Sequence, residues 1–370
     1  MTELDKFKQM LHDVSVSDVN DGEINFSNIR ELTNQLLKII PKKLYRFRSC
    51  NEYNLKSLKN NDIWGTLVTQ FNDPMECIPS YDFEQIKNSL NNELDNENII
   101  NRMNSIIDGS MPEVIKKTYP QRFLKQLAKN SSKNIDVHNF YNRLSLAKQN
   151  LISSLHDGFG EIETNFFRDV FHFTKHLYVA CFSENLTSPL MWGHYADSHK
   201  GFAIEYDMTQ YIKKWGDRFE NDTEYSIFHL NYQLAPVIYD KNRYDATSFF
   251  RQHIESKIIN DFQIPAKKLI EDDRFRIPKI VLRKSLDWQY EKEWRMFYYN
   301  LEENLPPEHK CLAENIKPTA VYMGDKTATT DNFNTLLDIC KENNIPCYRM
   351  VNKYTSNTFE LYPDMDNPLC

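Results

Sequence analysis

The sequence has few glycines and no long hydrophobic runs. Its 370 residues include 9 Gly and 15 Pro, which excludes collagen-like and low-complexity chains. The longest apolar stretches are shorter than the roughly 18 residues that a membrane-spanning helix needs, and residues 1–14 have no apolar signal-peptide core. We therefore expect a cytoplasmic protein that does not associate with membranes. The P-loop, the G-x-G-x-x-G turn and the G-x-S-x-G elbow are also missing, which argues against phosphate-loop and serine-hydrolase chemistry.

Paired cysteine motifs are missing as well. The seven cysteines are an odd number, and no two have C-x-x-C spacing. This pattern predicts reduced, mostly buried thiols instead of a disulfide framework or a zinc ribbon. Neither sign of charge is in large excess, because 52 acidic residues face 45 basic ones. This balance argues against a protein that coats nucleic acid by bulk charge, although a local basic patch fits it.

Aromatic residues, in contrast, are abundant, with 23 Phe, 20 Tyr and 5 Trp. They supply enough apolar surface for a folded core. Hydrophobic periodicity predicts an N-terminal helical segment over residues 1–41 and a single α+β domain over 42–370. We expect this domain to hold a short-stranded mixed sheet, with a helical insertion at about 82–175. The predicted strands cover residues 44–48, 62–69, 177–182, 201–206, 236–239, 291–299, 319–323 and 345–350.

Two clusters in the first part of the chain suit a binding site. In Tyr45-Arg46-Phe47-Arg48, the two arginines are two positions apart in a strand and therefore point to one side. They would either grip a phosphate or carboxylate or face solvent. Asn72 and Asp73 belong to a turn that directly follows a strand, and their side chains would cap that turn or face a ligand.

A third cluster runs from Cys181-Phe182-Ser183-Glu184 into the segment Leu190 to Gly201. Trp192 and Tyr195 are three positions apart on one helical face, where they would stack on a flat ring or pack in the core. His194 lies between them and is open to the same two interpretations.

The fourth cluster, Trp288 to Arg295, interleaves charges with aromatic residues. In a strand, Glu291, Glu293 and Arg295 share one face. Adjacent carboxylates repel, so the pKa of one rises unless Arg295 pairs with them. Such a group suits a functional site, and a solvated edge strand is the alternative.

Together, the motifs Y-R-F-R, F-N-D-P, C-F-S-E with M-W-x-H-Y-A-D-x-H-x-G-F, and W-x-Y-E-x-E-W-R resemble a bacterial family catalogued as domain of unknown function 2971. The resemblance covers about residues 42–352, apart from the insertion. The layout is similar to the ADP-ribosyltransferase superfamily, in which an early-strand Arg or His binds NAD and a late strand carries an essential Glu. It implies Arg46 as the early element and Glu293 or Glu291 as the late one. The middle Tyr or Ser position stays open among Asn72, Ser183 and Tyr195.

The resemblance implies NAD-dependent ADP-ribosyl transfer or NAD hydrolysis, in a bacterial defence or toxin effector. NAD would be the substrate, and a protein or nucleic acid the acceptor. The predicted catalytic residues are Glu293, Glu291 and Arg46. The predicted substrate-binding residues are Arg48, Asn72, Asp73, Ser183, Trp192, His194, Tyr195 and Arg295.

Two other functions remain open. One is a metal-dependent nuclease or phosphodiesterase, with a divalent ion among acidic and histidine side chains. The residues for that ion would be Asp73, Glu76, His194, Glu291 and Glu293. The other is a non-catalytic protein that binds a nucleotide in the cleft and contacts a partner protein through the helical insertion. The sequence does not indicate the oligomeric state.

Overall fold

The computed structural model describes the chain in two compact units. Unit 1 comprises Met1–Ile78, Phe173–Arg243 and Arg274–Cys370, and unit 2 comprises Pro79–His172 and Tyr244–Asp273. Most of the predicted insertion lies in unit 2 and outside the described residues. The described residues are 1–14, 19–20, 23–24, 27–93, 172–221, 234–252, 275–300, 308–311, 316–353 and 355–370, with single positions between 101 and 149.

Unit 2 contains helix α4 (Phe83–Glu93) and a helical stretch at residues 247–252. The Oδ1 atom of Asp82 accepts a hydrogen bond from the backbone N–H of Gln85 at 2.9 Å, and so caps α4 at its start. The backbone N–H of Asp82 donates to Oγ1 of Thr247 at 2.7 Å. A helix over 249–262 is predicted from the sequence, and its part beyond residue 252 lies outside the described residues.

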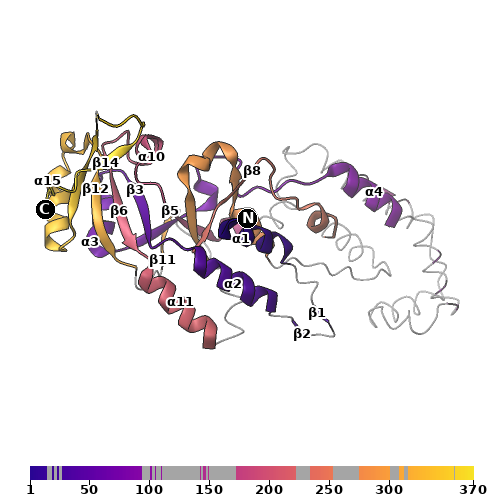
Figure 1. Ribbon diagram of the computed structural model, residues 1–370. Coiled ribbons are helices and arrows are strands. Elements are labelled where there is room, and N and C mark those ends of the chain that lie inside the picture. The colour runs from indigo at the N-terminus through magenta and orange to yellow at the C-terminus, as the bar shows by residue number, and fades with distance from the viewer. Residues whose placement is uncertain are drawn as a thin grey trace. The chain divides into compact units, whose positions relative to one another are not determined.

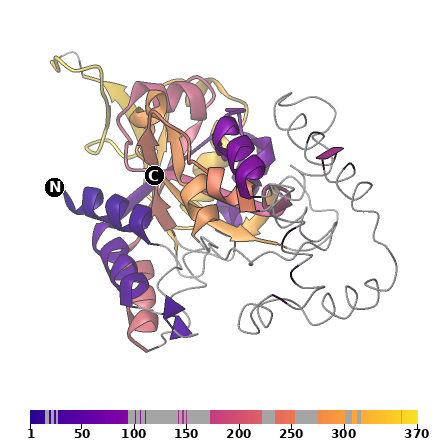
Figure 2. The same cartoon turned by 90° about the vertical axis from the view of Figure 1, so that its right-hand side faces the viewer.

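Unit 1 begins with two helices, as the apolar periodicity of residues 3–40 predicts. They are α1 (Glu3–Asp13) and α2 (Ser27–Ile39), with the short strands β1 (Val19–Asn20) and β2 (Glu23–Ile24) between them. Thr2 and Asp5 form a reciprocal capping box at the start of α1, which satisfies two otherwise unpaired backbone donors. Helix α2 contacts both α1 and α11 (Thr209–Asn221), and the three lie together in Figure 2.

A ten-stranded mixed sheet forms the centre of unit 1 (Figure 1). The strand order is β11-β4-β5-β3-β6-β12-β13-β14, and β10 pairs with β5 and β7. The β12–β13 pair is parallel, and the other pairs are antiparallel. The strands are β3 (Lys43–Arg48), β4 (Ile63–Leu67), β5 (Leu177–Ser183), β6 (Phe202–Asp207), β7 (Leu234–Pro236), β10 (Glu293–Tyr299), β11 (Glu308–Cys311), β12 (Pro318–Met323), β13 (Cys347–Asn352) and β14 (Leu361–Pro363).

Shorter elements connect and cover this sheet. Strands β8 (Ile238–Asp240) and β9 (Arg283–Ser285) form a separate parallel pair, and α15 (Phe333–Glu342) contacts α3 (Glu52–Asn60). The remaining helices are α10 (Pro189–Tyr195), α14 (Arg276–Val281), η2 (Val68–Gln70), η4 (His172–Lys175), η5 (Leu286–Glu291) and η6 (Thr327–Thr329). The mixed α+β class predicted from the sequence is confirmed.

Strand β5 has an unusual pairing that shapes the site. One edge pairs with β10 along its whole length, from Ser183 opposite Glu293 to Leu177 opposite Tyr299. The other edge is shared by two strands, because β4 pairs near Val179 and β3 pairs at Ser183. Strands β3 and β4 therefore diverge along β5 and leave room for side chains and a cavity between them.

The start of β10 differs from the prediction of a strand over 291–299. Glu291 ends the 3-10 helix η5, and the strand begins at Glu293. Between them, Lys292 adopts the left-handed conformation with φ 44°. The two glutamates thus come from different elements, although both still face the same site.

Candidate functional site

A cavity of about 380 Å³ lies in unit 1, where β3 and β4 diverge. This volume is within the range of small-molecule sites. Strands β3, β4 and β5, the segment after β4, helix α10 and the β9–β10 region all contribute lining residues. Its walls combine aromatic rings with two arginines, a lysine and three glutamates.

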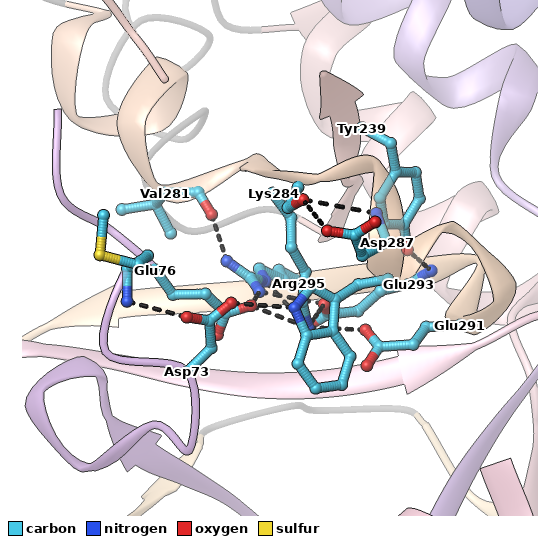
Figure 3. Close-up of polar contacts among 12 residues, drawn as sticks. Asp73, Glu76, Tyr239, Val281, Lys284, Asp287, Glu291, Glu293 and Arg295 are labelled. Atoms are coloured by element: carbon cyan, nitrogen blue, oxygen red, sulfur yellow. Dashed lines mark hydrogen bonds and ion pairs between the residues drawn. The ribbon is translucent and has the colours of Figure 1, made fainter. Parts of the chain in front are cut away.

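Three buried carboxylates meet two buried cations at one end of this cavity (Figure 3). The Nζ atom of Lys284 lies 2.7 Å from Glu76, 2.6 Å from Glu291 and 3.2 Å from Glu293. Arg295 holds Glu293 through Nε at 2.8 Å and Nη2 at 3.0 Å, and Nη2 also donates to Glu76 at 2.8 Å. All five residues are less than a tenth exposed. We call this group the Glu–Lys–Arg cluster.

Hydrogen bonds to the backbone of Glu291 and Glu293 position the Glu–Lys–Arg cluster. The Ser183 hydroxyl donates to the Glu291 carbonyl at 2.5 Å, which ties the end of η5 to the end of β5. The backbone N–H of Glu293 donates to the Tyr239 hydroxyl at 2.8 Å. Lys284 enters from β9, the strand next to β8. These contacts hold the carboxylates in fixed positions, as preorganised electrostatics requires.

The two glutamates that flank Lys292 differ in acidity. Burial, together with the charge of Glu293, raises the pKa of Glu291 to about 7. Burial also opposes ionisation of Glu293, but Arg295 and then Lys284 hold the pKa of that carboxyl well below its usual value. At neutral pH, one carboxylate therefore stays ionised while its neighbour exchanges a proton.

Tyr195, the last residue of α10, contacts this pair directly. Its hydroxyl donates to Oε1 of Glu291 at 2.5 Å. Burial and the Glu291 charge raise the pKa of the phenol far above its usual value, so the hydroxyl keeps its proton and remains a donor. His194 lies beside it, and its Nδ1 is 2.8 Å from the Tyr290 hydroxyl.

The cavity is also lined by two arginines of β3. Arg46 is 4% exposed, donates from Nη2 to the Trp64 carbonyl at 2.8 Å and places Cζ 5.3 Å from the Phe182 ring centroid. Its Nε has no hydrogen-bond partner, and none of the described residues offers it a carboxylate within 4.0 Å. Arg48 lines the same wall and is partly exposed. A buried guanidinium with an unused donor suits an anionic ligand.

Most of the site residues predicted from the sequence converge on this cavity. Those that line it are Arg46, Arg48, Asn72, Ser183, His194, Tyr195, Glu291 and Glu293. Their roles stay predictions, because the geometry places the side chains and does not test what they bind.

Three predicted substrate-binding residues lie elsewhere. Trp192 is fully buried in an apolar cluster, donates to the Leu186 carbonyl at 2.7 Å and packs edge-on against Phe47. Asp73 caps its own turn at the backbone N–H of Met75 and accepts from Trp288 Nε1 at 2.9 Å. Arg295 is fully buried and supports the carboxylates from behind. These three residues make core contacts and internal hydrogen bonds and are not among the residues that line the cavity, and their part in substrate binding stays a prediction.

Lys284 is the principal residue that sequence reasoning missed. It lies in Arg283-Lys284-Ser285, a short polar run that resembles a solvated turn. The available signal was its position two residues after the apolar run Ile280, Val281 and Leu282, which the structure buries. A lysine that follows a buried stretch is either at the surface or paired inside.

The residue set proposed for a metal-dependent nuclease does not converge around an open centre. Glu76, Glu291 and Glu293 meet at the ammonium of Lys284, which takes the place that a divalent cation would need. Asp73 and His194 are hydrogen-bonded to Trp288 and Tyr290. At this position the three carboxylates therefore form salt bridges with a lysine.

The comparisons with known proteins cover part of this site. Residues 191–296 match the model of a family described as Protein of unknown function (DUF2971). The match runs from α10 into β10 and includes Tyr195, Lys284 and both cavity glutamates of β10 and η5. No curated protein and no solved structure shows a significant match. Among the described residues, no helix is long and apolar enough to span a bilayer.

Proposed function

We propose that the cavity binds NAD and breaks its N-glycosidic bond, so that ADP-ribose passes to an acceptor or to water. One observation carries the proposal: two buried glutamates line one cavity with different partners, because Arg295 holds Glu293 and the Tyr195 hydroxyl donates to Glu291, and their pKa values shift in opposite directions. When the pKa values of two neighbouring carboxyl groups differ in this way, the one with the low pKa, Glu293, can act as a permanent negative charge. The one with the raised pKa, Glu291, can transfer a proton. The proposal also rests on the order of an arginine on β3, then a glutamate at the end of η5 and another at the start of β10, which is similar to the ADP-ribosyltransferase layout.

Glu293 is the electrostatic group in this proposal. Cleavage breaks the bond between ribose C1′ and the nicotinamide nitrogen, and the electron pair leaves with nicotinamide. Positive charge then develops on the ribose. A carboxylate held ionised by Arg295 and Lys284 would accept a hydrogen bond from the ribose 2′-OH and stabilise that charge, by about 3 kcal/mol for a well-placed group.

Glu291 is the proton-transfer group. As the acceptor oxygen attacks C1′, its proton passes to a nearby base. A carboxyl with a pKa of about 7 is poised for that task at neutral pH. Tyr195 orients Glu291 through its hydroxyl, which favours Tyr195 as the middle element over Asn72 and Ser183.

The two arginines of β3 are the residues proposed to bind the anionic part of NAD. Arg46 has an unused Nε donor and Arg48 lies two residues away on the same wall. Together they would hold the pyrophosphate or the adjacent ribose. The ring of Tyr195 lines the cavity, whereas that of Trp192 does not, so Tyr195 is the aromatic residue proposed to pack on nicotinamide.

Incubation with NAD tests the proposal, with free nicotinamide as the readout and candidate protein and nucleic-acid acceptors present. We expect release by the wild type, loss in Glu293→Gln, and no loss in Glu52→Gln, an exposed glutamate on α3. EDTA should not change the rate. No release by the wild type, or equal release by Glu293→Gln, would contradict the proposal.

The other functions give different outcomes in the same assay. NAD binding without nicotinamide release would favour a non-catalytic nucleotide-binding protein, and nuclease activity that EDTA abolishes would favour the metal-dependent alternative. The proposed role as a defence or toxin effector rests on the family resemblance. Induced expression, with and without phage, tests it, and unchanged growth in both conditions would count against it.

A further inference from the structure

Three cysteines meet in unit 1, far along the chain from the residues of the cavity. Cys340 lies near the end of α15, Cys347 is the first residue of β13 and Cys370 follows β14. Their sulfur atoms all lie within 4.8 Å of one another. In the part of the chain that the structure describes, no other group of three or more potential metal ligands comes this close.

The backbone around these thiols is held by hydrogen bonds. After α15, Asn344 adopts the left-handed conformation with φ 54°, and the N–H of Ile345 donates to the Cys340 carbonyl at 2.8 Å. The chain therefore turns back after α15 and brings the sulfur of Cys347 close to that of Cys340. Cys347 also exchanges backbone bonds with the last residues, from its N–H to the Cys370 carbonyl at 3.2 Å and from the Leu369 N–H to its own carbonyl at 2.7 Å.

We propose that Cys340, Cys347 and Cys370 form a thiolate site for one Zn²⁺ ion. Tetrahedral zinc binds thiolate sulfur at about 2.3 Å, which places neighbouring sulfurs about 3.8 Å apart. Thiols that already lie within 4.8 Å of one another reach this spacing by small side-chain rotations. The fourth position would take water or an external ligand, on the side of the partly exposed Cys370.

The chemistry of the three thiols fits zinc. Cys340 and Cys347 are fully buried, and free cysteines that are only structural need no convergence of this kind. Each thiol that binds zinc releases one proton, so binding strengthens as the pH rises.

Zinc titration of the full chain tests the site. The protein is prepared reduced and metal-free, and Zn²⁺ is added in competition with a chromophoric chelator. We expect one ion per chain for the wild type and binding more than ~10-fold weaker for Cys347→Ser, since even groups that only orient a ligand are worth ~10- to 100-fold. Cys50→Ser is the matched control, because Cys50 is a buried thiol outside the cluster, and it should bind as the wild type does.

A second variant covers the case in which Cys347→Ser does not fold. Cys370 is partly exposed, so Cys370→Ser should keep the fold and still weaken binding. With Co²⁺ as the probe, its thiolate-to-metal absorption should fall by about a third, because one sulfur of three is lost. The proposal would be overturned if the wild-type protein binds no zinc or if Cys370→Ser binds zinc as tightly as the wild type. It would also be overturned if the protein, as isolated, contains a disulfide between two of these three cysteines. None of these outcomes depends on NAD chemistry.

Discussion

The ammonium of Lys284 lies 2.6 Å from Oε2 of Glu291, and both side chains are almost completely buried. Lys284 also contacts Glu76 and Glu293, so it is the cation that the carboxylates share. Burial of three carboxylates is costly, and the cluster persists because its cations are buried with them.

Removal of this lysine should therefore destabilise the fold strongly. Lys284→Met leaves buried carboxylates with Arg295 as their remaining cation in the cluster, and we expect a loss of about 3–5 kcal/mol in unfolding free energy. Chemical denaturation measures it. The matched control is Lys59→Met, because Lys59 forms an exposed ion pair with Glu342, which should contribute less than about 1 kcal/mol. Equal losses in both variants would show that burial does not set the strength of the cluster.

The Tyr195 hydroxyl should set the acidity of Glu291. Its hydrogen bond stabilises the carboxylate and thereby lowers the pKa of Glu291, against burial and the charge of Glu293, which raise that pKa to about 7. Tyr195→Phe removes this donor, so the pKa of Glu291 should rise further and the carboxyl should stay protonated to higher pH. Carbon-13 NMR titration of the Glu side chains, assigned with Glu291→Gln, measures the change.

Tyr362→Phe is the control for that titration, since the Tyr362 hydroxyl bonds to Ser356 and Thr358 and does not line the cavity. It should leave the Glu291 titration unchanged. A titration that moves to lower pH in Tyr195→Phe would contradict the donor role of the hydroxyl.

Arg46 should determine anion affinity in the cavity. Arg46→Gln removes the charge and the unused Nε donor, and charge-assisted bonds of this type contribute about 1.5–3 kcal/mol, or roughly 10-fold or more in affinity. Calorimetric titration with ADP-ribose measures the dissociation constant, and thermal unfolding confirms that the variant folds. Arg349→Gln, on β13 and outside the cavity lining, should bind like the wild type. An unaltered affinity in a folded Arg46→Gln would remove Arg46 from the site.

Two glycines near α10 should respond in opposite directions to alanine. A Cβ at Gly201 would lie 2.1 Å from the Arg48 carbonyl oxygen, so Gly201→Ala must shift backbone, and such overpacking costs about 1–3 kcal/mol or more. A Cβ at Gly193, inside α10, meets nothing within 4 Å, so Gly193→Ala should stabilise by about 0.5–1 kcal/mol. Denaturation midpoints compare the two, and a stabilised Gly201→Ala would contradict the close approach of β3.

Strand alternation was the most informative sequence signal. It predicted that Arg46 and Arg48 face one side, and both line the cavity, although Tyr45 and Phe47 between and beside them line it too. It also predicted a shared face for Glu291 and Glu293, which do share a cavity, although Glu291 belongs to η5 and not to the strand. The convergence of β3 with β10 across β5 could not be read from the sequence, because it depends on pairing between segments more than a hundred residues apart.

Helical spacing was less informative. Trp192 and Tyr195 are three apart in α10, but Trp192 enters the core while Tyr195 lines the cavity. The helix has only seven residues. The three-residue spacing therefore predicts that the two side chains are neighbours, but it does not predict which of them is buried against the sheet. Lys284 was missed for a similar reason, since the carboxylates that pair with it come from β10, η5 and the segment after β4, and none of them is a periodic neighbour on its own strand.

The left-handed corner at Lys292 restricts which sequences can build this site. Its side chain is exposed, and its backbone, at φ 44°, carries the turn that lets Glu291 and Glu293 reach the same ammonium. The charge of the side chain at this position is therefore of little importance, whereas its compatibility with a positive φ restricts it. Glycine, asparagine and aspartate tolerate this conformation, and β-branched residues and proline do not. A solvent-facing position that touches nothing in the cavity would thus show a short list of accepted amino acids, and that list would record backbone geometry.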